Sequence, residues 1–124
     1  MPHWSDHPDA RRGAELFNSG KYFEAHEAWE EVWKHSEGAL RNFSQGLIQI
    51  AAGCVKIQRR QPAAAARLLA KGMGRVRESE AELGVSWTAG FLAEVECCLR
   101  EARRCEMENI AAVEVSFLAN LRVY

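Results

Sequence analysis

The feature that most constrains the fold is a helical hydrophobic period that recurs along most of the chain and is interrupted mainly at glycine and proline. These interruptions fall where helices commonly begin or end. The pattern predicts helices over residues 8–18, 21–36, 39–60, 62–83 and 88–106. The short connections between them favour antiparallel neighbours. We therefore expect an all-α fold, a small bundle of about five helices built from antiparallel helical hairpins.

The length of 124 residues predicts a single helical domain over 1–124. The tail, 109–124, is ambiguous. Val113, Val115 and Phe117 alternate as in an extended segment, whereas other residues would suit a short helix: Ala111, Ala112, Leu118, Ala119 and Leu121.

Two features indicate how the helices pack. Helix 39–60 carries apolar residues on most of its sides, which predicts a central, buried helix. Gly72 and Gly74 interrupt helix 62–83, and they favour either a kink or a close crossing of two helices.

Chemically reactive side chains gather on helix 21–36. At about 100° per residue, this helix has one apolar stripe, formed by Tyr22, Ala25, Trp29, Val32 and Trp33. His26 lies about 20° from Trp33, and Glu30 lies about 40° beyond His26. His26 and Glu30 are therefore expected at the margin of the core face. The residues expected to face water are Glu24, Ala28, Glu31 and His35.

Helix 39–60 offers a matching polar set. Gln45 and Gln49 are one turn apart and share a face with Arg41. A buried amide without a partner costs roughly 1–3 kcal/mol, so both glutamines should find partners on the neighbouring helix. We expect those partners to be His26, Glu27 and Glu30, with Arg41 as a counter-charge, in a cluster buried between the two helices.

Three interpretations of this cluster are open. In the first, it is a structural polar network that fixes the packing of the two helices. In the second, His26 and Glu30 are ligands of a divalent metal ion. The stretch HEAWE resembles the start of an H-E-x-x-H zinc helix, but position 30 is Glu and the Glu-x-x-His spacing of di-iron bundles is absent.

The third interpretation is a small-ligand or catalytic pocket. His26 would act as acid or base and Glu30 would orient its imidazole. The residues expected to contact the ligand are Glu27, Gln45, Gln49, Arg41 and Trp33. If the protein is an enzyme, hydrolytic or metal-assisted chemistry suits these residue types best.

Charge is segregated along the chain. Residues 38–77 contain eight Lys or Arg and no Asp or Glu, which favours a small anionic ligand or an anionic partner. The alternative is that this basic middle docks against the acidic first third. Arg67, Lys71 and Arg75 form one stripe, but this face has no interleaved aromatic residues and no RNA-binding signature, which argues against nucleic acid.

Other sequence features bear on the compartment and on partners. The four cysteines form no C-x-x-C pair, and the N-terminus has no apolar leader. No stretch reaches the ~20 apolar residues of a membrane span. We therefore expect a cytoplasmic protein with reduced thiols and no membrane partner. Four tryptophans leave room for a homodimer interface.

Three blocks carry a family resemblance: LFNSGKYFEAHEAWEEVW at 16–33, RNFSQGLIQIAAG at 41–53 and AAAARLLAKG at 63–72. In these blocks the chain resembles the bacterial and archaeal domain-of-unknown-function family numbered 309. The resemblance implies a small all-α bundle and no established activity. By position, the family's motif residues would be His26, Glu27, Trp29, Glu30, Gln45 and Gln49.

A second likeness supplies the alternative function. The spacing of Leu16, Gly20, Tyr22, Ala25, Trp29 and Val32 is similar to the turn of a tetratricopeptide hairpin, although no 34-residue period follows. In that case the protein would be a helical-hairpin module that binds a protein or peptide, and the polar cluster would be structural.

Overall fold

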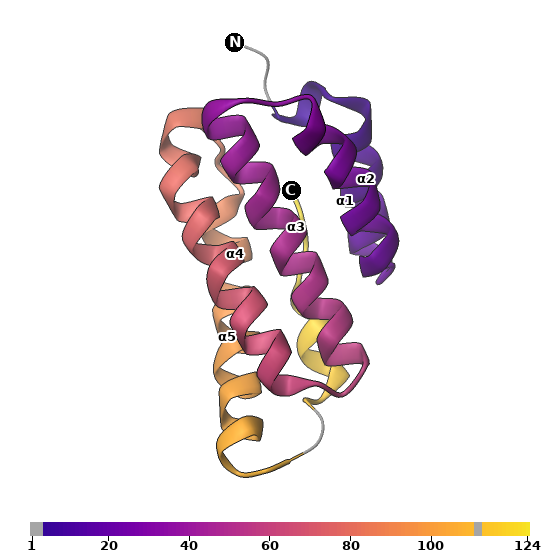
Figure 1. The fold of residues 1–124 in the computed structure, drawn as a ribbon, viewed down its shortest axis with the longest axis vertical. Coiled ribbons are helices and arrows are strands. Elements are labelled where there is room, and N and C mark those ends of the chain that lie inside the picture. The colour runs from indigo at the N-terminus through magenta and orange to yellow at the C-terminus, as the bar shows by residue number, and fades with distance from the viewer. Residues whose placement is uncertain (1–3, 111–112) are drawn as a thin grey trace.

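The computed structural model describes residues 4–110 and 113–124. Within these residues the chain forms α-helices joined by short connections, with no strand (Figure 1). The α-helices are α1 (Pro8–Asn18), α2 (Tyr22–Lys34), α3 (Gly38–Gln58), α4 (Pro62–Leu83) and α5 (Thr88–Met107). Two 3-10 helices flank them, η1 (Trp4–Asp6) and η2 (Val115–Asn120). The predicted all-α bundle is therefore confirmed.

Helix ends fall within two residues of the predicted bounds, and the local reasons are visible. Pro8 occupies the first turn of α1, and the imidazole Nδ1 of His7 accepts a hydrogen bond from the backbone N–H of Asp9 at 3.2 Å. Gly20 and Gly84 adopt φ values of +80° and +64° next to helix ends, a conformation that favours glycine.

Helix α3 is central, as predicted. It packs against α2 on one side and α4 on the other, while α1 covers α2 and α5 covers α4 (Figure 1). The expectation that α3 is apolar on most sides needs one correction. Gln45, Gln49 and Ala52 are half-buried along one edge, because α2 and α4 leave that edge open.

The crossing of α3 and α4 depends on glycine. A Cβ built on Gly72 would lie 2.6 Å from the backbone oxygen of Gly46, and a Cβ on Gly53 would lie 2.8 Å from the Leu69 side chain. Neither distance is sterically acceptable, so the helices reach this separation only without those side chains. The close crossing predicted at Gly72 is confirmed, whereas Gly74 meets nothing within 4 Å.

A similar contact fixes α2 on α1. The indole Nε1 of Trp29 donates a hydrogen bond to the backbone oxygen of Ala10 at 3.1 Å, and a Cβ on Gly13 would lie 2.3 Å from that nitrogen. Trp29 is fully buried and also contacts Phe17 and Trp4. This aromatic core holds the inner face of α2 in place, and the orientation of its outer flank follows from it.

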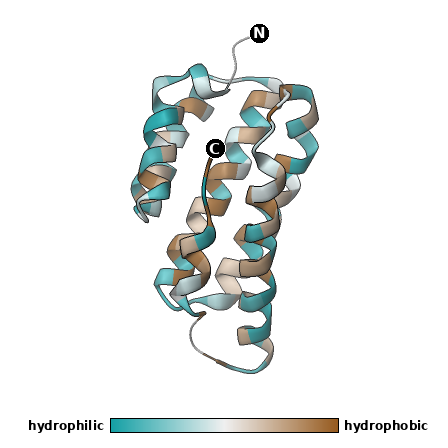
Figure 2. Cartoon of the chain, turned by 180° about the vertical axis from the view of Figure 1, so that it is seen from behind, coloured by the Kyte–Doolittle hydropathy of each residue, from teal (hydrophilic) through white to brown (hydrophobic). Residues whose placement is uncertain are grey.

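The ambiguous tail resolves into η2 followed by residues 121–124, and it runs back along the bundle (Figure 2). The side-chain amide of Asn18 pairs with both backbone groups of Val123, at 2.8 Å to its N–H and 3.0 Å to its oxygen. Leu118 and Leu121 are buried. Residues 111–112, which favoured the helical interpretation, lie outside the described part of the chain.

Across the described residues, no helix combines the length and the apolar character that a membrane crossing requires.

Candidate functional site

His26 and Glu30 lie on the flank of α2 that faces the open edge of α3. Imidazole Nε2 of His26 is 3.3 Å from carboxylate Oε1 of Glu30, and their side chains are 26% and 43% exposed. The predicted pairing one helical turn apart is present. The expectation of a buried cluster is corrected, because both groups reach solvent.

Both residues line a groove of about 490 Å³ between α2 and α3. Its polar lining also includes Gln45, Gln49 and Lys34. The rest of the lining is apolar or aromatic: Trp33, Ile48, Ala52 and Leu68. A lining that combines apolar and aromatic residues with a few polar groups is the usual composition of a small-ligand site.

Among the buried side-chain atoms that have no hydrogen-bond partner in the described part of the chain, two belong to residues that line this groove. They are Nδ1 of His26 and Oε1 of Gln49. Most buried polar atoms in folded proteins are satisfied, so two orphans among the lining residues of one groove call for an explanation. The expected hydrogen bonds from Gln45 and Gln49 to His26, Glu27 or Glu30 are not formed among the described residues.

The remaining predicted residues divide into two groups. Glu27 is exposed and does not line the groove, because residues adjacent in a helix point about 100° apart. Arg41 is placed one step away, with its guanidinium carbon 3.9 Å from the centroid of the Trp33 ring. It lines an adjoining hollow that shares Trp33 and Gln45 with the groove.

Of the residues expected to face water on α2, Ala28 is the clear error. Ala28 is fully buried, because α2 packs against α1 as well as α3 and so needs two apolar sides. Glu24 and His35 are exposed as expected, and Glu31 is half-buried.

Sequence reasoning missed several neighbours of the site. Leu68 reaches the groove from α4, and Phe23 stacks on the His26 ring with centroids 6.0 Å apart and an interplanar angle of 18°. Phe23 is 48% exposed, unusual for a phenylalanine. The spacing of three residues between Phe23 and His26 could have indicated their contact from the sequence. The contribution of Leu68 could not, because it depends on how α3 and α4 cross.

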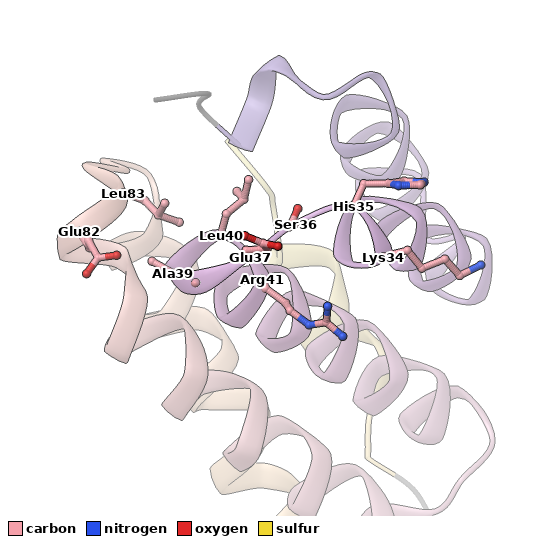
Figure 3. A pocket seen from close by; sticks show the side chains of 10 residues that line it. Lys34, His35, Ser36, Glu37, Ala39, Leu40, Arg41, Glu82 and Leu83 are labelled. Atoms are coloured by element: carbon pink, nitrogen blue, oxygen red, sulfur yellow. The ribbon is translucent and has the colours of Figure 1, made fainter.

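A larger hollow, of about 720 Å³, lies elsewhere, between the α2–α3 turn and the end of α4 (Figure 3). Among the predicted site residues, only Arg41 lines it, and Figure 3 shows this side chain extending away from Glu82 and Leu83. The side chains of Lys34 and His35 point outward. This hollow therefore contains no arrangement resembling the His26–Glu30 pair.

The described residues contain no group of three or more His, Cys, Asp or Glu side chains placed to hold a metal ion. His26 and Glu30 remain a pair. A metal ion at this position would need its further ligands from water or from a bound molecule.

One protein-family model matches the part of the chain that contains the groove. Residues 10–68 match the model of a family described as "Domain of unknown function (DUF309)". The predicted family resemblance is confirmed over these residues. The DUF309 match begins in α1 and ends at Leu68, so it contains every residue that lines the groove. No match was found among curated proteins, and none among solved structures.

Proposed function

We propose that the DUF309 segment binds a small polar ligand in the groove between α2 and α3, with His26 and Gln49 as the main hydrogen-bonding groups. The observation that carries this proposal is the pair of orphaned polar atoms on one groove. A ligand that pairs with both atoms would remove the desolvation penalty that the free protein bears at each of them.

The geometry at Glu30 indicates which chemistry the ligand should have. When the proton of a neutral imidazole is on Nε2, facing the carboxylate of Glu30, Nδ1 is a hydrogen-bond acceptor. Gln49 Oε1 is also an acceptor. The ligand should therefore carry hydrogen-bond donors, as hydroxyl, amine or amide groups do, and it reaches the covered atoms after small rotations of the two side chains.

His26 would also be placed to move a proton, because the neighbouring Glu30 carboxylate orients its ring. Among the described residues, no Ser, Thr, Cys or Tyr side chain lines the groove. If the ligand is hydrolysed, the attacking group would be a water molecule activated by His26, either directly or on a divalent ion held by His26 and Glu30.

In the alternative function, a helical interaction module, the cluster only holds α2 and α3 together. The two functions differ in the stability of the variant Gln49→Met. If Gln49 serves to bind a ligand, its Oε1 is buried without a partner in the free protein. Replacing it with methionine should then leave the free energy of unfolding unchanged or raise it. If Gln49 is structural, its replacement should lower the free energy of unfolding by about 1 kcal/mol or more.

The test is urea denaturation of the wild type, Gln49→Met and the control Gln58→Met. Gln58 lies on the same helix, and its Nε2 donates a hydrogen bond to the backbone oxygen of Gly20 at 3.3 Å. We expect Gln49→Met to be at least as stable as the wild type and Gln58→Met to be slightly less stable. A clear loss of stability in Gln49→Met would favour the structural alternative.

Binding is tested directly by ligand-observed NMR, with glycerol, ethanolamine and acetamide as probes. We expect saturation transfer to at least one probe in the wild type and its loss in Gln49→Met and His26→Ala. Transfer that persists in both variants would place the binding elsewhere and contradict the proposal.

A further inference from the structure

A second hollow, of about 350 Å³, adjoins the groove where α3 begins. It is lined by Trp33, Gly38, Arg41, Asn42, Gln45 and Arg75. Trp33 and Gln45 line both spaces, so the groove and this hollow lie side by side. Two guanidinium groups, one from α3 and one from α4, therefore line the same hollow.

Both guanidinium groups are held by contacts that do not neutralise them. Arg41 lies over the Trp33 ring at 3.9 Å, a cation–π contact that leaves its N–H donors free. Arg75 donates from Nη1 to Oδ1 of Asn42 at 3.0 Å. Oε2 of Glu78 lies 3.5 Å from Nδ2 of Asn42. This contact orients the Asn42 amide so that its oxygen faces Arg75.

Neither arginine forms an ion pair within the described part of the chain. Of the eight bases between residues 38 and 77, Arg77 forms a described ion pair, with Glu96 at 3.7 Å. None pairs with an acidic residue of 4–37. The basic middle does pack against the acidic first third, through α2 and α3, but among the described residues this contact contains no ion pair between them.

We propose that Arg41 and Arg75 bind an oxyanion, a phosphate or a carboxylate, carried by the same ligand whose donor groups pair with His26 and Gln49. Planar guanidinium groups suit these anions because their N–H donors match two oxygens at once. The proposal rests on the proposed function for the ligand's other end, while the anion site itself can be tested separately.

The spacing along α2 sets the size of such a ligand. His26 and Trp33 are seven residues apart, which is about 10 Å along a helix. A molecule with an oxyanion at one end and hydroxyl or amine groups about 10 Å away has the dimensions of a phosphorylated or carboxylated metabolite. The structure thus favours a small bifunctional molecule.

The experiment is a titration of the full chain with inorganic phosphate, and separately with acetate, at ionic strength held constant with sodium chloride. The readout is the NMR shift of the Trp33 indole N–H and of the arginine Nε–H groups. We expect a saturable shift that Arg41→Gln and Arg75→Gln each weaken roughly tenfold. The better of the two anions identifies the ligand's oxyanion.

The matched control is Arg67→Gln, because Arg67 is also exposed on α4 but lines a different hollow. Unchanged phosphate binding in this variant supports the proposal. An equal loss of phosphate binding in Arg67→Gln, or a shift that does not saturate, would overturn the proposal. So would tighter binding of a single-stranded RNA 12-mer to which all three arginines contribute. Arg75→Gln is tested as well because Arg41→Gln also removes the contact with the Trp33 ring. Weaker phosphate binding in Arg75→Gln does not depend on that contact.

Gln49→Met separates the two proposals. Phosphate binding that persists in this variant while all neutral probes fail in the wild type would support the anion site and contradict the proposed ligand groove. Neutral-probe binding without any saturable phosphate or acetate binding would overturn the anion site alone.

Discussion

The backbone oxygen of Gly46 lies where a methyl group on Gly72 would need to be, only 2.6 Å from that group's ideal position. This contact sets the separation of α3 and α4. It also determines how closely Leu68 and Arg75 on α4 approach the side chains of α3. The shape of the candidate site therefore depends on two residues that have no side chains.

Gly72→Ala should destabilise the protein by about 1–3 kcal/mol, since the added methyl group forces apart two closely packed backbones. The control is Gly74→Ala on the same helix. Gly74 meets nothing within 4 Å, so alanine there should raise stability by about 0.5–1 kcal/mol through its better helix propensity. Urea denaturation followed by circular dichroism measures both, and equal effects would show that the crossing tolerates a side chain.

The thiols should differ sharply in reactivity. Burial raises the pKa of Cys98 to about 12 and raises that of Cys54 well above its ordinary value. Since the thiolate is the reactive form, neither should react at pH 8 while the protein is folded. Cys97 is half-exposed, so Ellman's reagent should label one thiol quickly in the native state and the others after unfolding.

Cys97→Ser provides the control for that measurement. It should remove the fast phase and leave the slow phase unchanged. A fast phase that remains in this variant would show that a buried thiol is accessible on the time scale of the assay.

The end of α5 should contribute an acid-dependent stabilisation. Arg104 Nε lies 3.1 Å from both carboxylate oxygens of Glu101, and these hydrogen bonds lower the pKa of Glu101 below its ordinary value of 4.5. A carboxyl group with a lowered folded-state pKa stabilises the protein fully above its unfolded pKa. That contribution is lost as the pH falls through the folded value.

Arg104→Gln should therefore reduce stability at pH 7 and reduce the difference in stability between pH 7 and pH 3. Arg103→Gln, an exposed neighbour outside the described ion pairs, should behave as the wild type. Denaturation midpoints across this pH range measure both. A pH profile that is unchanged in Arg104→Gln would mean that the Glu101 contact does not persist in solution.

The helices and the placement of His26 beside Glu30 could be predicted from the sequence because both depend on local spacing. A four-residue separation brings two side chains onto one flank whatever the rest of the fold does. The position of Ala28 could not be found in this way, because a single apolar stripe says nothing about a second neighbouring helix. Glu27 does not reach the groove, because adjacent residues in a helix point about 100° apart and His26 already faces it.

The contribution of α4 to the site could not be predicted from the sequence either. Leu68 and Arg75 meet α3 because of the Gly46–Gly72 approach, and a sequence alone does not show which glycines face each other. The orphaned atoms of His26 and Gln49 contradicted the expectation that buried amides find protein partners. An unsatisfied buried group in a native protein needs an explanation, and a bound ligand would supply one for these two atoms.

The pairing of Asn18 with Val123 joins residues 105 positions apart in the sequence. On the ribosome, Asn18 emerges 105 residues before Val123, so this pairing forms only after the helices between them have been made. Until then α1 to α5 lack the segment that carries Leu118 and Leu121, so these two residues join the bundle after the helices. The apolar surface that Leu118 and Leu121 bury therefore stays uncovered while α1 to α5 are being synthesised.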